Sequence, residues 1–207
     1  IKEVSLPTLR RLPIYLQYLN KALANGQVTT SSTYIARDLG LDPTQVRKDL
    51  AFTGIEGKPK VGYPISNLID SIKHFLNWDN LNDAFLVGVG KLGSAMLGYE
   101  GYLQYGLKIV AAFDNDPAKI GEKVGLTQVL PLEKLVNLSQ RMHIQLGIIT
   151  VTADHAQEVA DLMVQGGIQA ILNFAPVSIN VPDGVLVHNE NLAAGLAVLC
   201  RHLKKEG

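Results

Sequence analysis

The chain has 207 residues, of which 47% are hydrophobic and 18% are charged. It is therefore long enough for one large domain or two small ones, and apolar enough to bury a core. No apolar run approaches the roughly 20 residues of a membrane span, and the first residues lack the apolar segment of a secretory signal. The one cysteine, Cys200, excludes an internal disulfide and a cysteine-only metal site, so we expect a cytoplasmic protein without membrane contact or metal.

The formal net charge of zero hides an uneven distribution of charged residues. Residues 1–62 carry nine basic and five acidic side chains, a net charge of +4, which leaves −4 on the remainder. A basic segment on an acidic body favours a polyanionic partner for the basic segment. We therefore expect the first third of the chain to bind nucleic acid.

Three short helices are expected in the first third. Pro13 suits the first turn of a helix that continues to the stop signal Asn25-Gly26. Ser31 or Ser32 can cap a second helix, which ends after Leu39.

The third helix has the strongest start signal in the chain. The run Asp42-Pro43-Thr44-Gln45 reads as a capping box, in which the Asp42 carboxylate accepts from free helix amides and Gln45 reaches back. The helices expected over residues 33–39 and 43–52 are joined by the tight turn Gly40-Leu41-Asp42. This arrangement is typical of a helix-turn-helix.

The third helix separates apolar and polar faces. Val46 and Leu50 are four residues apart and face the expected core, while the polar residues lie near the half of the helix that would enter a major groove. The basic, glycine-rich residues 54–62 have the composition of a β-wing. We expect double-stranded DNA to contact Arg10, Arg11, Thr44, Gln45, Arg47, Lys48, Lys58 and Lys60.

A fourth helix and a polar linker follow. Ser66 is expected to cap a helix that runs through Trp78, with Leu68 and Ile72 on its buried face. The polar run from Asp79 to Asp83 is the best domain boundary.

From residue 84 onward, apolar strands alternate with helices. Near-continuous apolar strands joined by helices indicate an α/β fold with a doubly wound parallel sheet. We expect strands over residues 85–89, 108–113, 145–150, 170–174 and 185–188, and helices over 91–103, 132–142, 154–165 and 190–204.

The first of these strands leads into a Gly-x-Gly-x-x-Gly motif made by Gly88, Gly90 and Gly93. These glycines permit a tight turn, a close approach of the backbone to a pyrophosphate, and close packing of helix on strand. The pyrophosphate would lie at the start of the helix near Lys91. Asp114 ends the second strand, where its carboxylate can accept from ribose hydroxyls and repel a 2′-phosphate. The sequence thus predicts a Rossmann-type site that prefers NAD(H) to NADP(H).

Three further places can reach the nucleotide. Two are the runs that follow later strands, Thr150–Ala153 and Asn173–Pro176. The third is Tyr99, expected two turns along the first helix, where it would either border the nicotinamide or be a partly exposed helix residue. The expected nucleotide-binding residues are Gly88, Gly90, Lys91, Leu92, Gly93, Tyr99, Asp114, Thr150, Val151 and Asn173.

Two alternatives remain open at this point. In an NAD-dependent oxidoreductase with an accessory first domain, His155 would be the best-placed acid–base group. A nucleotide-binding structural protein would not touch DNA. Since no separate substrate domain follows the nucleotide site, we expect no enzyme and assign no catalytic residue.

The last expected helix carries an apolar stripe. Leu192, Leu196, Leu199 and Leu203 are spaced at four, three and four residues. The stripe either covers the chain's own sheet or packs on a second subunit, as a dimer that reads two DNA half-sites requires.

In this order, the motifs resemble the Rex family of redox-sensing transcriptional repressors over essentially the whole chain. The residues that carry the resemblance are Arg11-Leu-Pro13, Arg47-Lys-Asp49, Gly54, Gly57-Lys58, Gly62-Tyr63, Gly88–Gly93, Ala112-Phe-Asp114, Lys119-Ile-Gly121, Gly167-Ile168, Ile171–Phe174 and Asn180-Val-Pro182.

The resemblance implies a homodimer that binds operator DNA through winged-helix domains and is released by NADH. It implies three parts: a DNA-binding domain over residues 1–79, an NAD(H)-binding Rossmann domain over 80–189, and a helix over 190–207 exchanged between subunits. Arg47 and Lys48 then fall on the recognition helix, Lys58 and Lys60 on the wing, and Tyr99 near the nicotinamide. Arg11 matches a domain-interface arginine whose aspartate partner in some members is replaced here by Asn191.

Overall fold

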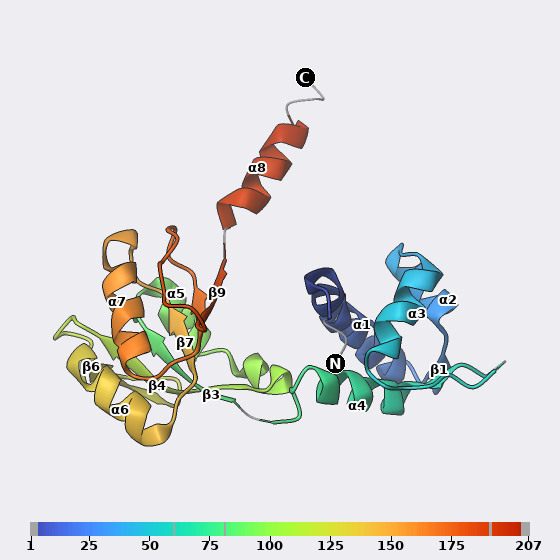
Figure 1. Ribbon diagram of the computed structural model, residues 1–207, viewed down its shortest axis with the longest axis horizontal. Helices are drawn as coiled ribbons and strands as arrows, with labels where there is room; N and C mark the ends of the chain where they lie inside the picture. Colours follow the sequence, from blue (N-terminus) through green and yellow to red (C-terminus); the bar gives the residue numbers. More distant parts are fainter. Residues whose placement is uncertain (1–3, 60, 81, 191, 204–207) are drawn as a thin grey trace. The chain divides into compact units, whose positions relative to one another are not determined.

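The computed structural model describes residues 4–59, 61–80, 82–190 and 192–203 (Figure 1). The chain divides after Asn80 into two compact units. Each unit has its own buried core.

The first unit is mostly helical. Its elements are α1 (Leu6–Ala24), β1 (Thr29–Thr30), α2 (Ser32–Leu39), α3 (Pro43–Ala51), β2 (Tyr63–Pro64) and α4 (Ile65–Phe75). The helix-turn-helix of α2 and α3 is confirmed, with Ser31 and Asp42 as N-cap residues and Gly40 left-handed at the end of α2. The core is built from α1, α2, α3 and α4 and includes Leu12, Leu19, Ile35, Val46, Leu50, Leu68 and Ile72.

Two predicted helix starts in this unit are wrong. Helix α1 begins at Leu6, because the Ser5 side chain caps it, and Pro13 lies inside the helix. Leu9, whose carbonyl would have accepted a hydrogen bond from residue 13, is exposed, so water can replace that bond. Helix α4 begins at Ile65, whose amide donates to Val28 O at 2.9 Å, and Ser66 is inside its first turn.

The second unit contains a seven-stranded sheet with the order β5-β6-β4-β3-β7-β8-β9. The strands are β3 (Asn82–Val87), β4 (Leu107–Asp114), β5 (Lys123–Val124), β6 (Thr127–Pro131), β7 (Leu146–Ile149), β8 (Ala170–Asn173) and β9 (Leu186–Asn189). Neighbouring strands are parallel except for β5 and β6, a short antiparallel pair. The predicted doubly wound parallel sheet is confirmed, while the β5–β6 hairpin was not predicted.

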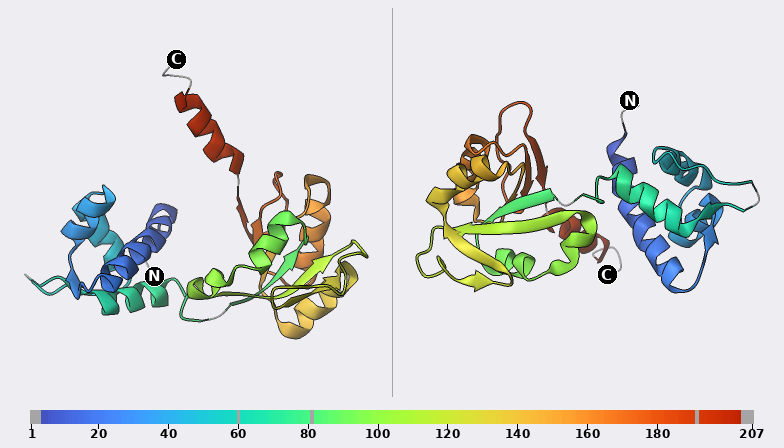
Figure 2. Two further views of the ribbon diagram at one scale, coloured as in Figure 1. Left: turned by 180° about the vertical axis from the view of Figure 1, so that it is seen from behind. Right: turned by 90° about the horizontal axis from the view of Figure 1, so that it is seen from below.

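Helical segments cover both faces of this sheet, as Figure 2 shows. Alternate residues of β3 point to opposite faces: Phe85 and Val87 pack with α6 (Leu135–Met142) and α7 (Ala153–Gln165), whereas Ala84 and Leu86 pack with Met96 of α5 (Lys91–Leu97). Short 3₁₀ helices, η1 (Glu100–Tyr105) and η2 (Leu132–Lys134), complete the connections. Since helices leave the carboxyl ends of β3 and β7, a ligand site is expected there.

The helix predicted over residues 91–103 is shorter than expected. Helix α5 ends at Leu97 and Gly98 caps it, so Tyr99 is not two turns along a helix but precedes η1. The physical reason is the pair Gly98 and Gly101, because glycine is a poor helix former.

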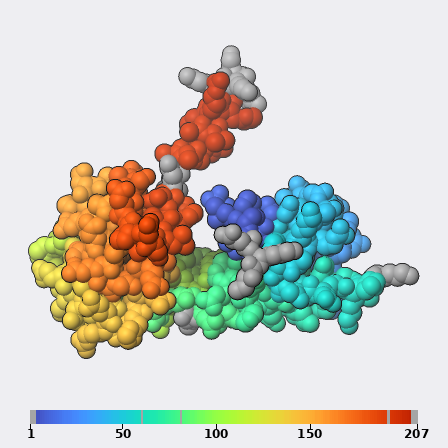
Figure 3. Space-filling model, in the orientation of Figure 1, coloured from blue at the N-terminus to red at the C-terminus, as the bar shows by residue number. Residues whose placement is uncertain are grey.

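The last helix, α8 (Leu192–Leu203), has no packed face in the described chain. All its described side chains, from 193 to 203, are exposed, and Figure 3 shows the helix uncovered. Leu196, Leu199 and Leu203 are 60%, 62% and 72% exposed. The alternative in which the stripe covers its own sheet is therefore wrong for these residues. None of the helices in the described part of the chain is long and apolar enough to span a membrane.

Candidate functional site

The turn between β3 and α5 depends on two glycines that have no space for a side chain. Gly88 has φ +101°, and a Cβ there would meet the Val151 side chain at 2.7 Å. A Cβ on Gly93 would collide with the Gly88 carbonyl oxygen. By contrast, a Cβ on Gly90 would meet nothing within 4 Å. Gly88 and Gly93 therefore pack closely against neighbouring atoms, whereas the space beside Gly90 is open.

Thr150, which directly follows β7, hydrogen-bonds to this turn from the neighbouring strand. Its hydroxyl lies 2.7 Å from Gly88 O and 3.1 Å from Val87 O, so its single proton is shared between two carbonyl acceptors. Thr150 therefore holds the glycine turn in place. Its direct contact with a ligand remains a prediction.

Asp114, at the end of β4, is 6% exposed and accepts three hydrogen bonds. The donors are the Val89 amide at 2.7 Å, the Asp116 amide at 2.9 Å and the Lys119 ammonium at 3.1 Å. Burial opposes the charged form, but these donors outweigh burial and lower the pKa of Asp114. The carboxylate is therefore ionised at neutral pH and ties the glycine turn to β4.

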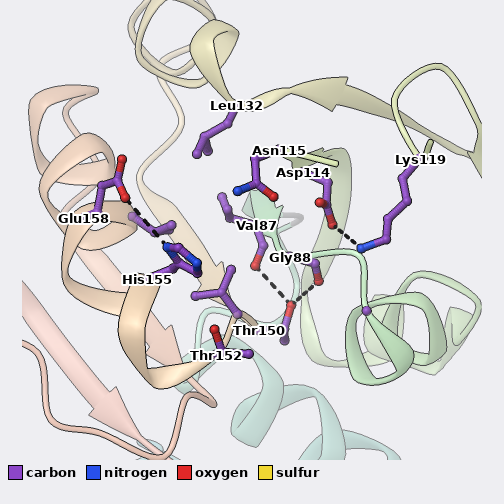
Figure 4. A pocket seen from close by; sticks show the side chains of 13 residues that line it. Val87, Gly88, Asp114, Asn115, Lys119, Leu132, Thr150, Thr152, His155 and Glu158 are labelled. Atoms are coloured by element: carbon purple, nitrogen blue, oxygen red, sulfur yellow. Dashed lines mark hydrogen bonds and ion pairs between the residues drawn. The ribbon is translucent and has the colours of Figure 1, made fainter. Parts of the chain in front are cut away.

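These residues surround a pocket of about 450 Å³ at the carboxyl ends of β3, β4 and β7 (Figure 4). Five predicted nucleotide-binding residues line it: Gly88, Gly90, Asp114, Thr150 and Val151. Two further lining residues were also expected near the ligand: Thr152 lies in the run Thr150–Ala153, and His155 is the acid–base candidate of the oxidoreductase alternative. Sequence reasoning did not assign the remaining lining residues, which are Val87, Asn115, Lys119, Leu132, Glu158 and Val159.

Lys119 is the most informative of these additions. Its ammonium lies 3.1 Å from Asp114 and 3.7 Å from Asp116. A cation beside the Asp114 carboxylate, the predicted ribose reader, offsets part of its negative charge. The sequence places Lys119 five residues after Asp114, but no local rule assigns a lysine in the next loop to the strand end.

The other five predicted nucleotide-binding residues do not line the pocket. Lys91, Leu92 and Gly93 form the first turn of α5, whose start has no side-chain cap. Tyr99 is 53% exposed and stacks edge-on against Tyr102 with 5.0 Å between ring centroids. Asn173 is fully buried and its amide bonds to Val177 O, Asn189 and the Ala175 amide. Asn173 thus orders the loop after β8, and its ligand contact stays a prediction.

His155 lies at the pocket edge and is 56% exposed, 3.9 Å from Glu158. Figure 4 shows the two side chains on the α7 side, across the pocket from Asp114 and Lys119. No other described pocket-lining residue carries an imidazole.

In the first unit, α3 presents Thr44, Arg47 and Lys48 to solvent on one face. Val46, Asp49 and Leu50 are buried on the other face. An exposed cationic face beside a helix-turn-helix can meet phosphates and base edges in a major groove.

The side chains of Arg11 and Gln45 both hydrogen-bond to Asp49 within the first unit. The Arg11 guanidinium donates to the Asp49 carboxylate at 2.6 and 2.9 Å. The Gln45 amide donates to Asp49 at 2.9 Å, so it does not reach back to Asp42 as the capping box predicts. The other half of that box is confirmed, because the Asp42 carboxylate accepts from the backbone N–H of Gln45 at 2.8 Å.

The described residues of the predicted wing form one antiparallel bridge next to a short strand pair. Lys58 and Gly62 bridge in antiparallel fashion, and Thr30 of β1 pairs with Tyr63 of β2. Gly62 has φ +83°, and a Cβ there would collide with Thr30 O. Arg10 and Lys58 are exposed, whereas Lys60 and Asn191 lie outside the described residues.

Comparison with known proteins supports this division of the chain. Residues 3–51 match the family described as "Putative DNA-binding protein N-terminus", and residues 79–177 match "CoA binding domain". A redox-sensing transcriptional repressor Rex from Treponema denticola is 44% identical over 198 residues, 96% of this chain and 94% of the relative. The Rex of Carboxydothermus hydrogenoformans is 41% identical, over 96% of each chain.

Solved structures agree over the full length. A crystal structure of RSP in complex with β-NAD+ and operator DNA has a TM-score of 0.93 at 32% identity, and covers 100% of this chain and 95% of that one. RSP in complex with β-NADH has a TM-score of 0.88 at 31% identity, with 100% and 97% covered. With this similarity along nearly its whole length, the chain belongs to the Rex family of redox-sensing transcriptional repressors.

Proposed function

We propose that this protein represses transcription by binding operator DNA through α3 and the wing, and that NADH in the β3–β4–β7 pocket weakens this binding. The observation that carries the proposal is that one chain holds both an exposed cationic helix-turn-helix and a nucleotide-type pocket. The first unit exposes Arg47 and Lys48 on a helix-turn-helix, and the second holds Asp114 beside an open glycine turn. The solved relatives with operator DNA and with NADH support assigning a ligand to each unit.

The pocket residues fit a dinucleotide. The open space at Gly90 lets a pyrophosphate approach the backbone near the uncapped start of α5. The ionised Asp114 carboxylate can accept from ribose hydroxyls. It would repel the 2′-phosphate of NADP(H), a repulsion that Lys119 reduces.

We infer that the pocket serves regulation and not turnover. Its one imidazole, in the described part of the lining, is mostly exposed and lies on the side away from Asp114. A dehydrogenase requires a proton-transferring group held against the substrate. Steady absorbance at 340 nm with NADH and a panel of carbonyl compounds is expected. Any sustained NADH oxidation by the purified protein would favour the oxidoreductase alternative.

A ligand shifts a conformational equilibrium only through different affinities for the two states. NADH must therefore bind the DNA-free state more tightly than the operator-bound state, and the reduced nicotinamide must make the difference. A coupling of about 1–3 kcal/mol gives roughly 5- to 150-fold changes in affinity. Tyr99 remains our proposed neighbour of the nicotinamide.

The experiment that tests the two binding functions separately is a pair of titrations. Calorimetry with NADH, NAD+, NADPH and coenzyme A would measure the affinity of the pocket for each ligand. Fluorescence anisotropy with the operator used in the RSP complex and with a scrambled duplex would measure the DNA affinity that we assign to the first unit. We expect NADH to bind more tightly than NADPH and coenzyme A, and the operator to bind more tightly than the scrambled duplex. Equal affinities within either set would refute the corresponding function.

A further inference from the structure

A buried carboxylate lies on the inner face of α3, the proposed DNA-reading helix. Asp49 of α3 is fully buried, and within the described residues its two oxygens receive five hydrogen bonds. Thr8, Arg11 and Tyr15 of α1 donate from 3.0, 2.6 and 2.7 Å, with a second Arg11 bond at 2.9 Å. Gln45 of α3 supplies the fifth bond at 2.9 Å.

This carboxylate is charged. Burial alone would favour the protonated form, but the bonds from Arg11, Tyr15, Gln45 and Thr8 outweigh burial and lower the pKa of Asp49. A buried anion is tolerated only when its acceptor sites are filled. Here the donors fill them, and three of the four donor residues belong to α1.

The hydrogen bonds to Asp49 restrain the rotation of α3 about its own axis, which apolar packing alone does not fix. Val46 and Leu50 bury α3 against the core, but hydrophobic contact is non-directional. Hydrogen bonds depend strongly on angle and distance. Anchoring Asp49 to three residues of α1 therefore fixes how far α3 is rotated about its own axis. Arg47 and Lys48, two residues and one residue before Asp49, are exposed on the other face and rotate with it.

We propose that Asp49 is a positioning residue for DNA recognition. Its hydrogen bonds hold α3 in the rotation about its own axis at which Arg47 and Lys48 meet their base edges. The proposal rests on the proposed function in that it takes α3 as the DNA-reading helix. Arg11 and Gln45 then act through Asp49, by filling its acceptor sites, and not by direct contact with DNA.

The charge of Asp49 makes the proposal testable, because two accounts of Asp49→Asn predict opposite results. If the carboxylate only repels phosphates, its removal strengthens binding to every duplex. If it positions α3, its removal weakens operator binding on the order of tenfold, about one lost base contact, while binding to a scrambled duplex is unchanged or stronger. The ratio of the two affinities is the readout, measured on the full chain by anisotropy.

Milder variants keep the test valid if Asp49→Asn unfolds. Tyr15→Phe and Thr8→Val each remove one donor and should lower the operator-to-scrambled affinity ratio by about threefold, a cost of roughly 0.6–0.7 kcal/mol. Thr8→Ser retains the hydroxyl and should restore the ratio. Tyr18→Phe is the matched control, because its hydroxyl bonds to Asp38 outside this cluster, at 2.9 Å.

The outcomes separate the two proposals. If the wild type itself does not prefer the operator, the proposed function fails. If the wild type prefers it and folded Tyr15→Phe and Thr8→Val keep the wild-type ratio, the positioning role is overturned. A lower ratio that Thr8→Ser restores and Tyr18→Phe leaves unchanged supports it, with thermal melts confirming that each variant is folded at the assay temperature.

Discussion

The carboxylate of Asp114 accepts a hydrogen bond from the backbone nitrogen of Val89 at 2.7 Å. This bond joins the end of β4 to the glycine turn after β3. Asp114 therefore shapes the glycine turn, and we propose that the same carboxylate also reads the ribose of a bound nucleotide.

Replacing Asp114 by alanine should both weaken NADH binding and reduce the preference for NADH over NADPH. The first effect follows from the lost bond to Val89, and the second from the lost repulsion of a 2′-phosphate beside the freed Lys119. Calorimetric titration of both nucleotides measures the ratio. Asp116→Ala is the control for the lost Val89 bond, since the Asp116 side chain also lies near Lys119, at 3.7 Å, but accepts from Ala118 and not from Val89. A ratio equal to that of the wild type would remove Asp114 from nucleotide selection.

Replacing Gly93 by alanine should abolish NADH binding while ligand-free operator binding persists. The new Cβ would collide with the Gly88 carbonyl oxygen, so the start of α5 must move away from the turn. Gly98→Ala is a suitable control, because its Cβ would lie 3.6 Å from Ser94 O, an ordinary contact. Normal NADH affinity in Gly93→Ala would contradict the packing described for the turn.

Replacing Arg47 by alanine should cost about 1–3 kcal/mol of operator binding and relax sequence preference, if the guanidinium reads a base edge. Lys58→Ala on the wing should weaken binding to all duplexes similarly. It should also lower the slope of log affinity against log salt concentration by about one. Anisotropy titrations at several salt concentrations distinguish the two patterns. Unchanged discrimination in Arg47→Ala would place the base-reading contact elsewhere.

Placing charge in the stripe of α8, as in Leu199→Glu, should convert a dimer into monomers. We propose that the exposed stripe packs on a second copy of the chain, because Leu196, Leu199 and Leu203 have no cover within the described residues. Sedimentation equilibrium measures the change in mass. Asn180→Glu, at an exposed position outside α8, is the control. A wild-type monomer at micromolar concentration would overturn the dimer proposal.

The parts of this molecule that were predictable from sequence are those set by local chemistry. The caps at Ser31 and Asp42, the left-handed Gly40 and the strand–glycine–helix unit each follow from a few adjacent residues. Alternation of apolar strands with helices predicted the parallel sheet. The errors at Pro13 and Ser66 have physical causes: the Ser5 side chain caps α1, and the Ile65 amide bonds to Val28 O, so each helix begins before the predicted residue.

What the sequence could not predict depends on contacts between distant segments. Arg11 and Asp49 are separated by 38 positions, and no local pattern pairs them. As isolated motif residues, both Arg11 and Gln45 read as DNA contacts, whereas folding brings both to one buried carboxylate. Lys119 was missed for a similar reason, since it joins the pocket only because its loop folds back onto Asp114.

The most direct test of the central claim is operator affinity at a fixed total concentration of NADH plus NAD+ while their ratio is varied. Anisotropy with a labelled operator would measure the dissociation constant at each ratio. Operator binding should weaken progressively, by about 5- to 150-fold in total, as NADH replaces NAD+. The same dissociation constant at both extremes, with calorimetry confirming that the pocket is saturated, would contradict the claim that this protein senses redox state.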